Sequence, residues 1–504
     1  MIKIDKTPNN VKGRGGKIIA TALTLVLSGS AWASDWKLGA SVTARETYTD
    51  NVTLGAGGAA KSDWITELTP TFTVKKVGAR LKVDASYSNQ NLFYANNSNR
   101  NQTYHRLNAQ ANAELFENEV FLDTTASISQ ASISPLGASG VDNTSATGNV
   151  TSVQTFVVSP YWIHRFGSAA TLNARYTISE VSNDSGVFSS SLSNTVNVSL
   201  NSGSDFGRVS WGLNYSDHTA NYADRSDVGF TSTSASLGYQ VFHRVRLTGT
   251  VGDENNSYAS SAGTKTGGTF WNATVSWAPS MRTSLDLGFG HHYYGSTRNM
   301  KFTTRGAYSQ WTADYSEAVT TSNSQFGQSN SLDIGRNRTT GQAVQLTTNS
   351  NYLSNQVFLS KRFSTDFNWK KGKHDFSLGA FRSVQTTSID TTQNTNIQIT
   401  AIGFNRSAND VFLSTSEVKQ IGVNASWKWR WTALTNSNIS ATLTRSDYPS
   451  LSRQDTISSL QFGIDRRFSP KLTGAVSLRH QVRDSNQNAD YTENALSGSV
   501  TYTF

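Results

Sequence analysis

The chain has 504 residues, a formal net charge of +9, only 36% hydrophobic residues and no cysteine. The absence of cysteine excludes disulfides and any metal site or redox motif built on thiols. The hydrophobic content is low for a chain of this length with a globular core, but 12 Trp, 18 Tyr and 24 Phe argue against a disordered chain. A membrane β-barrel fits both observations, because each strand turns one face to lipid and the other to a polar lumen.

The first 33 residues have the features of a secretory signal peptide. They contain five Lys or Arg, an apolar core at 18–27, and an A-x-A cleavage pattern at Ala31 and Ala33 before Ser34. The apolar core is too short to cross a membrane as a helix. We therefore expect cleavage after Ala33 and export of residues 34–504. Removal of these five basic residues and one acidic residue lowers the net charge from +9 to +5, a surplus too small to indicate a nucleic-acid partner.

Residues 34–504 alternate between apolar and polar side chains with a period of two, as half-buried strands do. The period is clear at 81–87, 423–431 and 472–479, and no stretch approaches the length of an apolar membrane-spanning helix. An inner-membrane protein held by helices is therefore excluded. Trp427, Trp429 and Trp431 precede a short turn, where an aromatic girdle is expected at the membrane interface. A soluble sandwich with an aromatic core strand is the alternative that the pattern leaves open.

Short and long connections alternate along the chain, as an up-and-down barrel requires. Short turns are predicted at 77–78, 118, 166–168, 278–280, 371–373, 432–433 and 469–470, and longer polar stretches at 134–150, 255–267, 323–352 and 388–414. Outer-membrane barrels have short periplasmic turns and long extracellular loops, which sets the expected orientation. The count predicts an all-β, antiparallel transmembrane barrel of about 22 strands, within a range of roughly 18–22. Its weakest strand is 299–304, and its six prolines are expected at strand ends or turns.

The last strand shows the alternation best. Leu496, Gly498, Val500, Tyr502 and Phe504 share one face, which we expect to contact lipid, and Ser or Thr residues share the other. Backbone groups in lipid need partners, so such strands close into a barrel without a free edge. A terminal Phe on an amphipathic strand also resembles the signal read by the bacterial barrel-assembly machinery. That resemblance implies that Val500, Tyr502 and Phe504 carry the assembly signal.

His291 and His292 are adjacent, and adjacent imidazoles would be candidates for a metal site. Neighbours in a strand point to opposite faces, however, so the two rings cannot readily share one ion. We expect His291 in an interfacial girdle, and a role in the lumen stays open for His292. The chain contains no G-x-S-x-G, H-E-x-x-H or phosphate-binding glycine loop. We therefore expect neither an enzyme nor a bound cofactor.

Basic residues gather near the predicted short turns, and two interpretations of them stay open. They can contact phospholipid headgroups of the inner leaflet, which we favour, or form a cationic periplasmic mouth that attracts an anionic polymer. The Asn, Ser and Thr of the long stretches suit contact with sugar hydroxyls, but solvated loops have the same composition. The basic clusters are Lys75, Lys76, Arg80 and Lys82; His164 and Arg165; His243, Arg244 and Arg246; Lys370, Lys371 and Lys373; and Arg466, Arg467 and Lys471.

Six motifs resemble, in their order and spacing, those of the PEP-CTERM system-associated outer-membrane protein family. They are ETYTDNV at 46–52, ELTP at 67–70, AELF at 113–116, ISQASISP at 128–135, WAPSMRTS at 277–284 and GFGHHYYG at 288–295. The resemblance covers essentially all of residues 34–504. It implies an outer-membrane barrel in a Gram-negative bacterium with exosortase-type sorting and exopolysaccharide loci. The expected partners are outer-membrane lipids, the barrel-assembly machinery and exopolysaccharide or its export proteins.

Two functions are compatible with such a barrel. The first is a passive conduit for export of surface polysaccharide or related cargo. The second is a non-conducting structural or docking barrel that anchors surface material or partner proteins. A fold does not decide between them, because both use the same one. The distinguishing property is whether the lumen conducts.

Overall fold

The computed structural model describes residues 36–186, 188–258, 265–328, 335–336, 343–344, 353–387 and 410–504. Their dominant feature is one antiparallel sheet of 22 strands. Its strands are β1 (Trp36–Thr49), β2 (Asp63–Val77), β3 (Leu81–Tyr94), β4 (Gln102–Phe116), β5 (Val120–Ser132), β6 (Val150–Phe166), β7 (Ala170–Asn183), β8 (Ser191–Ser202), β9 (Val209–Tyr222), β10 (Val228–Phe242), β11 (Val245–Ser257), β12 (Gly267–Ser280), β13 (Thr283–His292), β14 (Gly295–Arg305), β15 (Ser309–Thr321), β18 (Val357–Lys371), β19 (His374–Thr387), β20 (Glu417–Arg430), β21 (Thr435–Tyr448), β22 (Arg453–Arg467), β23 (Leu472–Ser485) and β24 (Tyr491–Thr503).

Shorter elements lie in the connections between these strands. A separate two-stranded pair consists of β16 (Gly335–Arg336) and β17 (Ala343–Val344). The helical segments are α2 (Ser322–Gln328), η2 (Gly57–Ala59), η3 (Ser98–Arg100), η4 (Ser204–Phe206), η6 (Val411–Leu413) and η7 (Pro449–Leu451). No helix in the described part of the chain is long and apolar enough to cross a membrane.

The sheet closes on itself because its first and last strands pair. β1 and β24 run antiparallel, with Ser41 opposite Thr503 and Thr49 opposite Ala495. Closure leaves no unpaired strand edge, which lipid would not tolerate. The predicted antiparallel transmembrane barrel is thus confirmed at 22 strands. The weakest predicted strand, 299–304, lies within β14.

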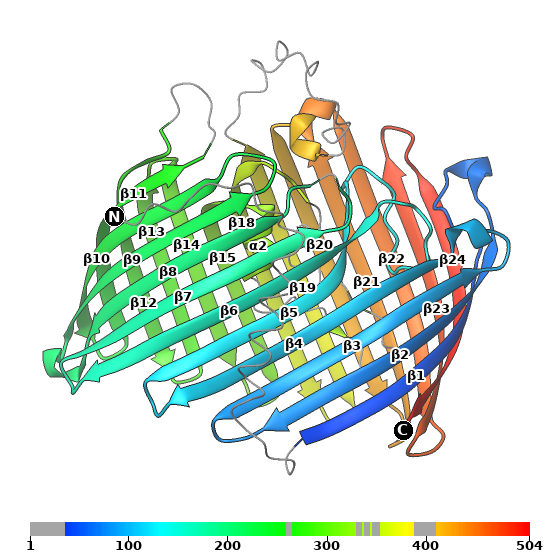
Figure 1. The fold of residues 1–504 in the computed structure, drawn as a ribbon, viewed down its shortest axis with the longest axis horizontal. Helices are drawn as coiled ribbons and strands as arrows, with labels where there is room; N and C mark the ends of the chain where they lie inside the picture. The colour runs from blue at the N-terminus through cyan, green and yellow to red at the C-terminus, as the bar shows by residue number, and fades with distance from the viewer. Residues whose placement is uncertain are drawn as a thin grey trace.

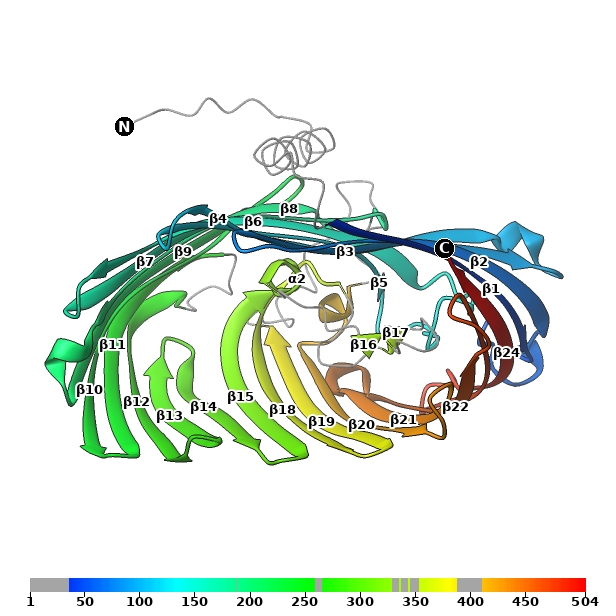
Figure 2. The same cartoon turned by 90° about the horizontal axis from the view of Figure 1, so that it is seen from below.

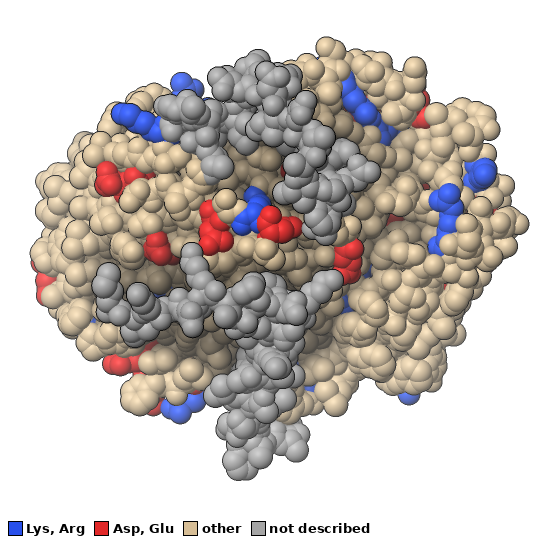
Figure 3. Space-filling view, turned by 45° about the horizontal axis from the view of Figure 1, so that its top comes forward, with Lys and Arg blue, Asp and Glu red and all other residues tan. Residues whose placement is uncertain are grey.

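The period of two divides every strand between the outer wall and the lumen. On β24, Leu496, Val500 and Tyr502 are 42–50% exposed on the outside, whereas Glu493 and Ser497 are buried on the inside. Most of the outer wall visible in Figure 3 carries no Lys, Arg, Asp or Glu. An apolar outer belt around a polar interior is the arrangement that a barrel needs in lipid.

The two ends of the barrel differ in the length of their connections (Figure 1). One end, at the bottom of Figure 1, has short turns such as 243–244 between β10 and β11 and 372–373 between β18 and β19. Gly372, with φ of 58°, takes the left-handed conformation that such a tight turn needs. The other end carries the long connections 133–149, 322–356 and 388–416. We call these the short-turn end and the long-loop end, and their alternation follows the sequence prediction.

Two prolines depart from their expected positions at strand ends. Pro70 lies in the middle of β2, and Pro160 lies well inside β6. The β2–β3 ladder is interrupted between Leu68 and Thr71, and the β6–β7 ladder is interrupted in the same way around Pro160. Each proline still has a partner in the strand on its other side, Val42 for Pro70 and Leu122 for Pro160. A missing N–H is therefore tolerated by a local gap in one ladder.

The turn predicted at 278–280 also lies elsewhere. β12 continues to Ser280, so the turn falls at residues 281–282. The register between β12 and β13 shifts between Trp277 and Ser280, on either side of Pro279. A local irregularity of this kind accommodates the proline and lets the strand continue past it.

Candidate functional site

Residues 133–149, which connect β5 to β6, fold into the lumen along the inner face of the barrel. We call this segment the inner loop. It reaches past β1–β4 to strands β23 and β24, more than 300 residues later in the chain. The amide of Gln481 donates to the carbonyl of Ser139 at 2.9 Å and to the hydroxyl of Tyr491 at 2.7 Å, and the hydroxyl of Tyr491 donates to the same carbonyl at 2.9 Å. The side chain of Gln481 also accepts from the backbone N–H of Val141 at 3.2 Å.

An ion pair between Asp142 and Arg479 ties the inner loop to the wall. Arg479 on β23 donates to Asp142 at 2.5 Å and to Glu493 of β24 at 2.8 Å, and all three side chains are at most 12% exposed. Burial acts to raise the pKa of Asp142, but Arg479 and hydrogen bonds from Thr144 outweigh burial and lower this pKa to about 2. Asp142 is therefore ionised at neutral pH, and Arg479 is the guanidinium that its carboxylate contacts.

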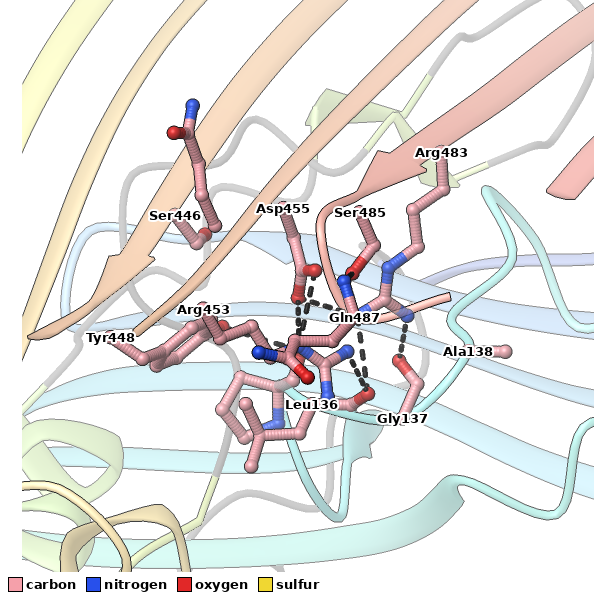
Figure 4. Close-up of polar contacts among 12 residues, drawn as sticks. Leu136, Gly137, Ala138, Ser446, Tyr448, Arg453, Asp455, Arg483, Ser485 and Gln487 are labelled. Atoms are coloured by element: carbon pink, nitrogen blue, oxygen red, sulfur yellow. Dashed lines mark hydrogen bonds and ion pairs between the residues drawn. The ribbon is translucent and has the colours of Figure 1, made fainter. Parts of the chain in front are cut away.

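A second group of contacts holds the inner loop by its backbone (Figure 4). Arg483 donates to the carbonyls of Gly137 and Leu136 at 2.7 and 3.1 Å, and Arg453 donates to that of Leu136 at 2.8 Å. Asp455 lies between the two guanidinium groups, 2.7 Å from Arg483 and 3.0 Å from Arg453. The two arginines extend from β22 and β23 toward the loop. Because these bonds end on carbonyls, they fix the path of the loop independently of its side chains.

The charged wall beneath the inner loop is balanced. Arg45 of β1 pairs with Glu67 of β2 at 3.1 Å, and Thr49 donates to Glu493 at 2.9 Å. Acidic and basic side chains also lie next to each other near the middle of the face shown in Figure 3. Loss of the Asp142 carboxylate alone would leave this network one positive charge in excess. Its members are Arg45, Arg453, Arg479 and Arg483 with Glu67, Asp142, Asp455 and Glu493.

The helix α2 is a second segment inside the ring of strands, as Figure 2 shows. Asn323 donates at 2.9 Å to the carbonyl of Ser189 and to the hydroxyl of Ser191. The hydroxyl of Ser324 lies 3.1 Å from Nε2 of His218 on β9. Ser191 and His218 are buried, so α2 covers these two positions on the inner faces of β8 and β9.

A third segment, 410–416, joins the residues that precede β18. The carboxylate of Asp410 accepts from the hydroxyl of Ser354 at 3.0 Å and from the backbone N–H groups of Asn355 and Phe412 at 2.8 and 3.1 Å. Burial raises the pKa of Asp410 above its ordinary value, although these hydrogen bonds act in the opposite direction. Asp410 therefore links two connections that leave the barrel at different strands.

Apolar contacts join these segments and residues 353–356 to one another. Leu136 of the inner loop packs against the buried cluster that contains Val411 and Phe412. Ile133, at the start of the inner loop, and Phe326 of α2 pack against the buried cluster that contains Leu353. The inner loop, α2, 353–356 and 410–416 thus form one connected layer inside the long-loop end. We call it the loop layer.

Strands β8–β10 present an uncharged face to the lumen below this layer. Leu213 and Leu237 are 52% and 64% exposed on the outer wall, so the residues that alternate with them face inward. Asn197 and Asn214 on this inner face are exposed, which means that water reaches them. Hydroxyl, amide and glycine residues make up the face: Thr195, Asn197, Ser199, Asn201, Ser210, Gly212, Asn214, Ser216, Ser232, Ser234, Ser236 and Gly238.

The two adjacent histidines point to opposite faces, as the strand period predicts. His291 is exposed on the outer wall. His292 faces inward, where its Nδ1 lies 2.9 Å from Glu254 and its ring stacks on Phe270 at a centroid distance of 4.7 Å. Within the described residues, no group of three or more His, Asp or Glu side chains could hold a metal ion.

The predicted basic clusters lie at the short-turn end, and three of their Lys and Arg side chains pair with carboxylates there. Lys75 pairs with Asp84 at 3.4 Å, Arg80 pairs with Glu117 at 3.0 Å, and Lys370 pairs with Asp375 at 3.8 Å. These pairs are largely exposed, so each contributes little to stability. They lower the net positive charge of this end by the three carboxylates involved, and both interpretations of the clusters stay open.

Two sets of predicted residues remain predictions. The cleavage residues Ala31, Ala33 and Ser34 lie outside the described residues. Val500, Tyr502 and Phe504 lie on the outer wall, 42–69% exposed. The rings of Tyr502 and Phe504 meet edge to face at a centroid distance of 5.2 Å, and the N–H of Phe504 donates to the carbonyl of Ala40 at 3.0 Å.

The attachment of the inner loop is the feature that sequence reasoning missed. One signal was available on β23, where Arg479, Gln481 and Arg483 place three long polar side chains on successive inward positions. A second signal was Asp142, the single charged residue of the inner loop. Three such side chains facing a lumen predict an internal partner, because buried charges are paired.

Comparisons with known proteins describe the fold alone. No protein-family model and no curated protein matches the chain. The siderophore receptor PirA from Pseudomonas aeruginosa is 10% identical, with a TM-score of 0.45 over 94% of this chain and 82% of that chain. The outer membrane protein OpdK from Pseudomonas aeruginosa is 10% identical, with a TM-score of 0.35 over 93% of this chain and 99% of that chain. The siderophore receptor PirA from Acinetobacter baumannii is 8% identical, with a TM-score of 0.43 over 94% of this chain and 81% of that chain.

Proposed function

We propose that this protein is an outer-membrane conduit for a weakly charged, hydroxyl-rich polymer, and that the loop layer narrows its lumen. The observation that carries the proposal is the water-exposed, uncharged inner face of β8–β10. It lies opposite a wall whose Arg453, Arg479 and Arg483 hold the inner loop. The inner face of β8–β10 can therefore contact the cargo, whereas the opposite wall holds the inner loop.

The chemistry of the uncharged face suits a polysaccharide. Ser and Thr hydroxyls both donate and accept, and Asn amides offer donors and an acceptor at one side chain. Such groups can exchange hydrogen bonds with sugar hydroxyls along the whole path. Transport requires that binding be weak and repeated, so that cargo enters and also leaves. A face of short polar side chains without fixed charge meets that requirement.

The family resemblance supports the choice of cargo and the location. Proteins of the PEP-CTERM system-associated outer-membrane group occur in bacteria with exopolysaccharide loci, which makes a surface polysaccharide the cargo that we propose. The apolar outer belt supports insertion in the outer membrane. In the orientation usual for such barrels, the short-turn end faces the periplasm and the loop layer lies near the cell surface.

A docking barrel is the second candidate, and the loop layer favours it. The segments of the loop layer pack together inside the long-loop end, where they offer a surface on which surface material could be held. Buried ion pairs such as Asp142–Arg479 would then be permanent supports. In a conduit, the same pairs would hold a segment that moves aside.

Conductance across a planar bilayer distinguishes the two candidates. The inner loop can be shortened without disturbing the barrel, because its ends are adjacent: the N–H of Ile133 donates to the carbonyl of Asn149 at 3.0 Å. Residues 134–148 would be replaced by Asn-Gly, the two-residue sequence favoured in tight hairpins. We expect the wild type to form small channels and the shortened protein to form larger ones. A shortened barrel that is folded, as judged by heat-modifiable migration, but silent would support docking and contradict the conduit.

A further inference from the structure

The outer wall carries an aromatic groove near the short-turn end, and we infer that it binds an anionic phospholipid of the inner leaflet. The groove is lined by Phe367 and Trp369 of β18, Phe376 of β19 and Trp427 of β20, and has a volume of about 500 Å³. The inference concerns the outside of the barrel and does not rest on what the lumen does.

The groove lies in the lipid-facing row of side chains. Trp369 pairs with Phe376, and Phe376 pairs with Trp427, so the three rings are neighbours across β18, β19 and β20. Trp427 is 40% exposed and the adjacent Leu378 is 42% exposed. From Trp427, stacked rings continue toward the turn through Trp429 at 6.0 Å and then Trp431 at 4.6 Å. An occupant of this row is therefore apolar, as a lipid acyl chain is.

Two lysines lie where the headgroup of such a lipid would be. Lys371 is two residues beyond Trp369, which is about 7 Å along a strand. The headgroup region of a bilayer is roughly 5–8 Å deep on each side. Lys373 follows in the same turn. The groove and the two lysines therefore match the spacing between an acyl chain and a phosphate group.

These two lysines keep their charge available. In the described part of the chain, neither Lys371 nor Lys373 pairs with a carboxylate. The ammonium of Lys371 lies 5.2 Å from the centre of the Tyr308 ring, and that of Lys373 donates to the carbonyl of Trp431 at 3.1 Å. The neighbouring Lys370, by contrast, has Asp375 as a partner. A phosphate would be the anionic partner that Lys371 and Lys373 do not have in the described part of the chain.

A second copy of the chain fits the groove less well than a lipid. In a two-fold symmetric dimer, the same patch meets itself. Lys371 and Lys373 of one copy would then face those of the other, and like charges across an interface are unfavourable. A zwitterionic lipid would fill the groove but would leave the lysines with less net attraction. An anionic glycerophospholipid satisfies both parts of the site.

Native mass spectrometry of the folded barrel tests this inference. Phosphatidylglycerol and phosphatidylcholine with identical acyl chains would be added to the detergent-solubilised protein. Lys371→Gln/Lys373→Gln removes the headgroup contacts, and Trp427→Leu opens the groove. Lys471→Gln, at another short turn, is the control for charge. Trp271→Leu is the control for the ring, because Trp271 is 44% exposed on the same outer wall.

The wild type should retain phosphatidylglycerol at least tenfold more strongly than phosphatidylcholine. The double lysine variant should lose that preference, since each basic residue near a membrane surface contributes about a fivefold change in affinity. Trp427→Leu should weaken the retention of both lipids, and both controls should behave as the wild type does. Equal retention of the two lipids, or unchanged retention in the variants, would overturn the inference. So would a dimer that Trp427→Leu abolishes. Heat-modifiable migration of each variant separates a lost site from a misfolded barrel.

Discussion

Replacement of Asp142 by Asn tests whether the inner loop is a movable part. The change removes the negative charge that Arg479 holds at 2.5 Å, while Arg479 keeps Glu493 as a second partner. The full cost of an unpaired buried charge, about 3–5 kcal/mol, therefore does not apply. A hydrogen bond to a charged group contributes about 1.5–3 kcal/mol. The ratio of open to closed inner loop should rise about 10- to 150-fold.

Single-channel recording in planar bilayers measures this ratio as the fraction of time spent at high conductance. Asp184→Asn is the matched control, because Asp184 is an exposed acid in the connection between β7 and β8. Asp142→Asn should lengthen the open periods, and Asp184→Asn should leave them as in the wild type. If Asp142→Asn, the control and the wild type have the same open fraction, the loop layer is not a gate held by this ion pair.

Three further predictions concern pH, packing and assembly. The pKa of Asp142 is lowered to about 2. The stabilisation of the closed inner loop by ionised Asp142 is therefore fully present at pH values above the ordinary pKa of a carboxyl group, and it is lost as the pH falls toward 2. The open fraction of the wild type should therefore stay constant from neutral pH to about pH 4 and rise below it, and Asp142→Asn should show no such rise. Phe412→Ala removes a ring that is 3% exposed, at a cost of up to about 3–5 kcal/mol. Limited proteolysis should then cut 410–416 at least tenfold faster while the barrel stays intact, and an unchanged rate would mean that this cluster does not hold the layer. Phe504→Ala should lower the amount of protein in the outer membrane, whereas the inward neighbour change Thr503→Ala should not; equal amounts would argue against an assembly role.

The barrel itself could be predicted from sequence because its information is local. A strand in lipid repeats every two residues, so segments such as 472–479 identify themselves without knowledge of any partner. The alternation of short and long connections then gives the direction of each strand. Even the weak segment 299–304 could be assigned, because a closed barrel with both ends on one side needs an even number of strands.

The interior of the barrel could not be predicted in the same way. Asp142 and Arg479 are 337 residues apart. The local sequence around each residue does not indicate that the other is its partner. The composition of the inner loop is that of any solvated loop, and much of its attachment runs through backbone carbonyls such as that of Gly137. The positions of Pro70 and Pro160 inside strands could not be predicted for the same reason. Only the pairing of neighbouring strands shows which hydrogen-bond ladder can be interrupted.

The central claim is that the lumen passes a weakly charged, hydroxyl-rich polymer once the loop layer is displaced. The most direct measurement is release of trapped polymers from vesicles that contain the protein, with neutral dextran compared with dextran sulfate of the same length. The barrel with Asn-Gly in place of 134–148 should release dextran faster than the wild type does, and faster than it releases dextran sulfate. Release of neither polymer by the folded, shortened barrel, or faster release of the sulfated one, would contradict the claim.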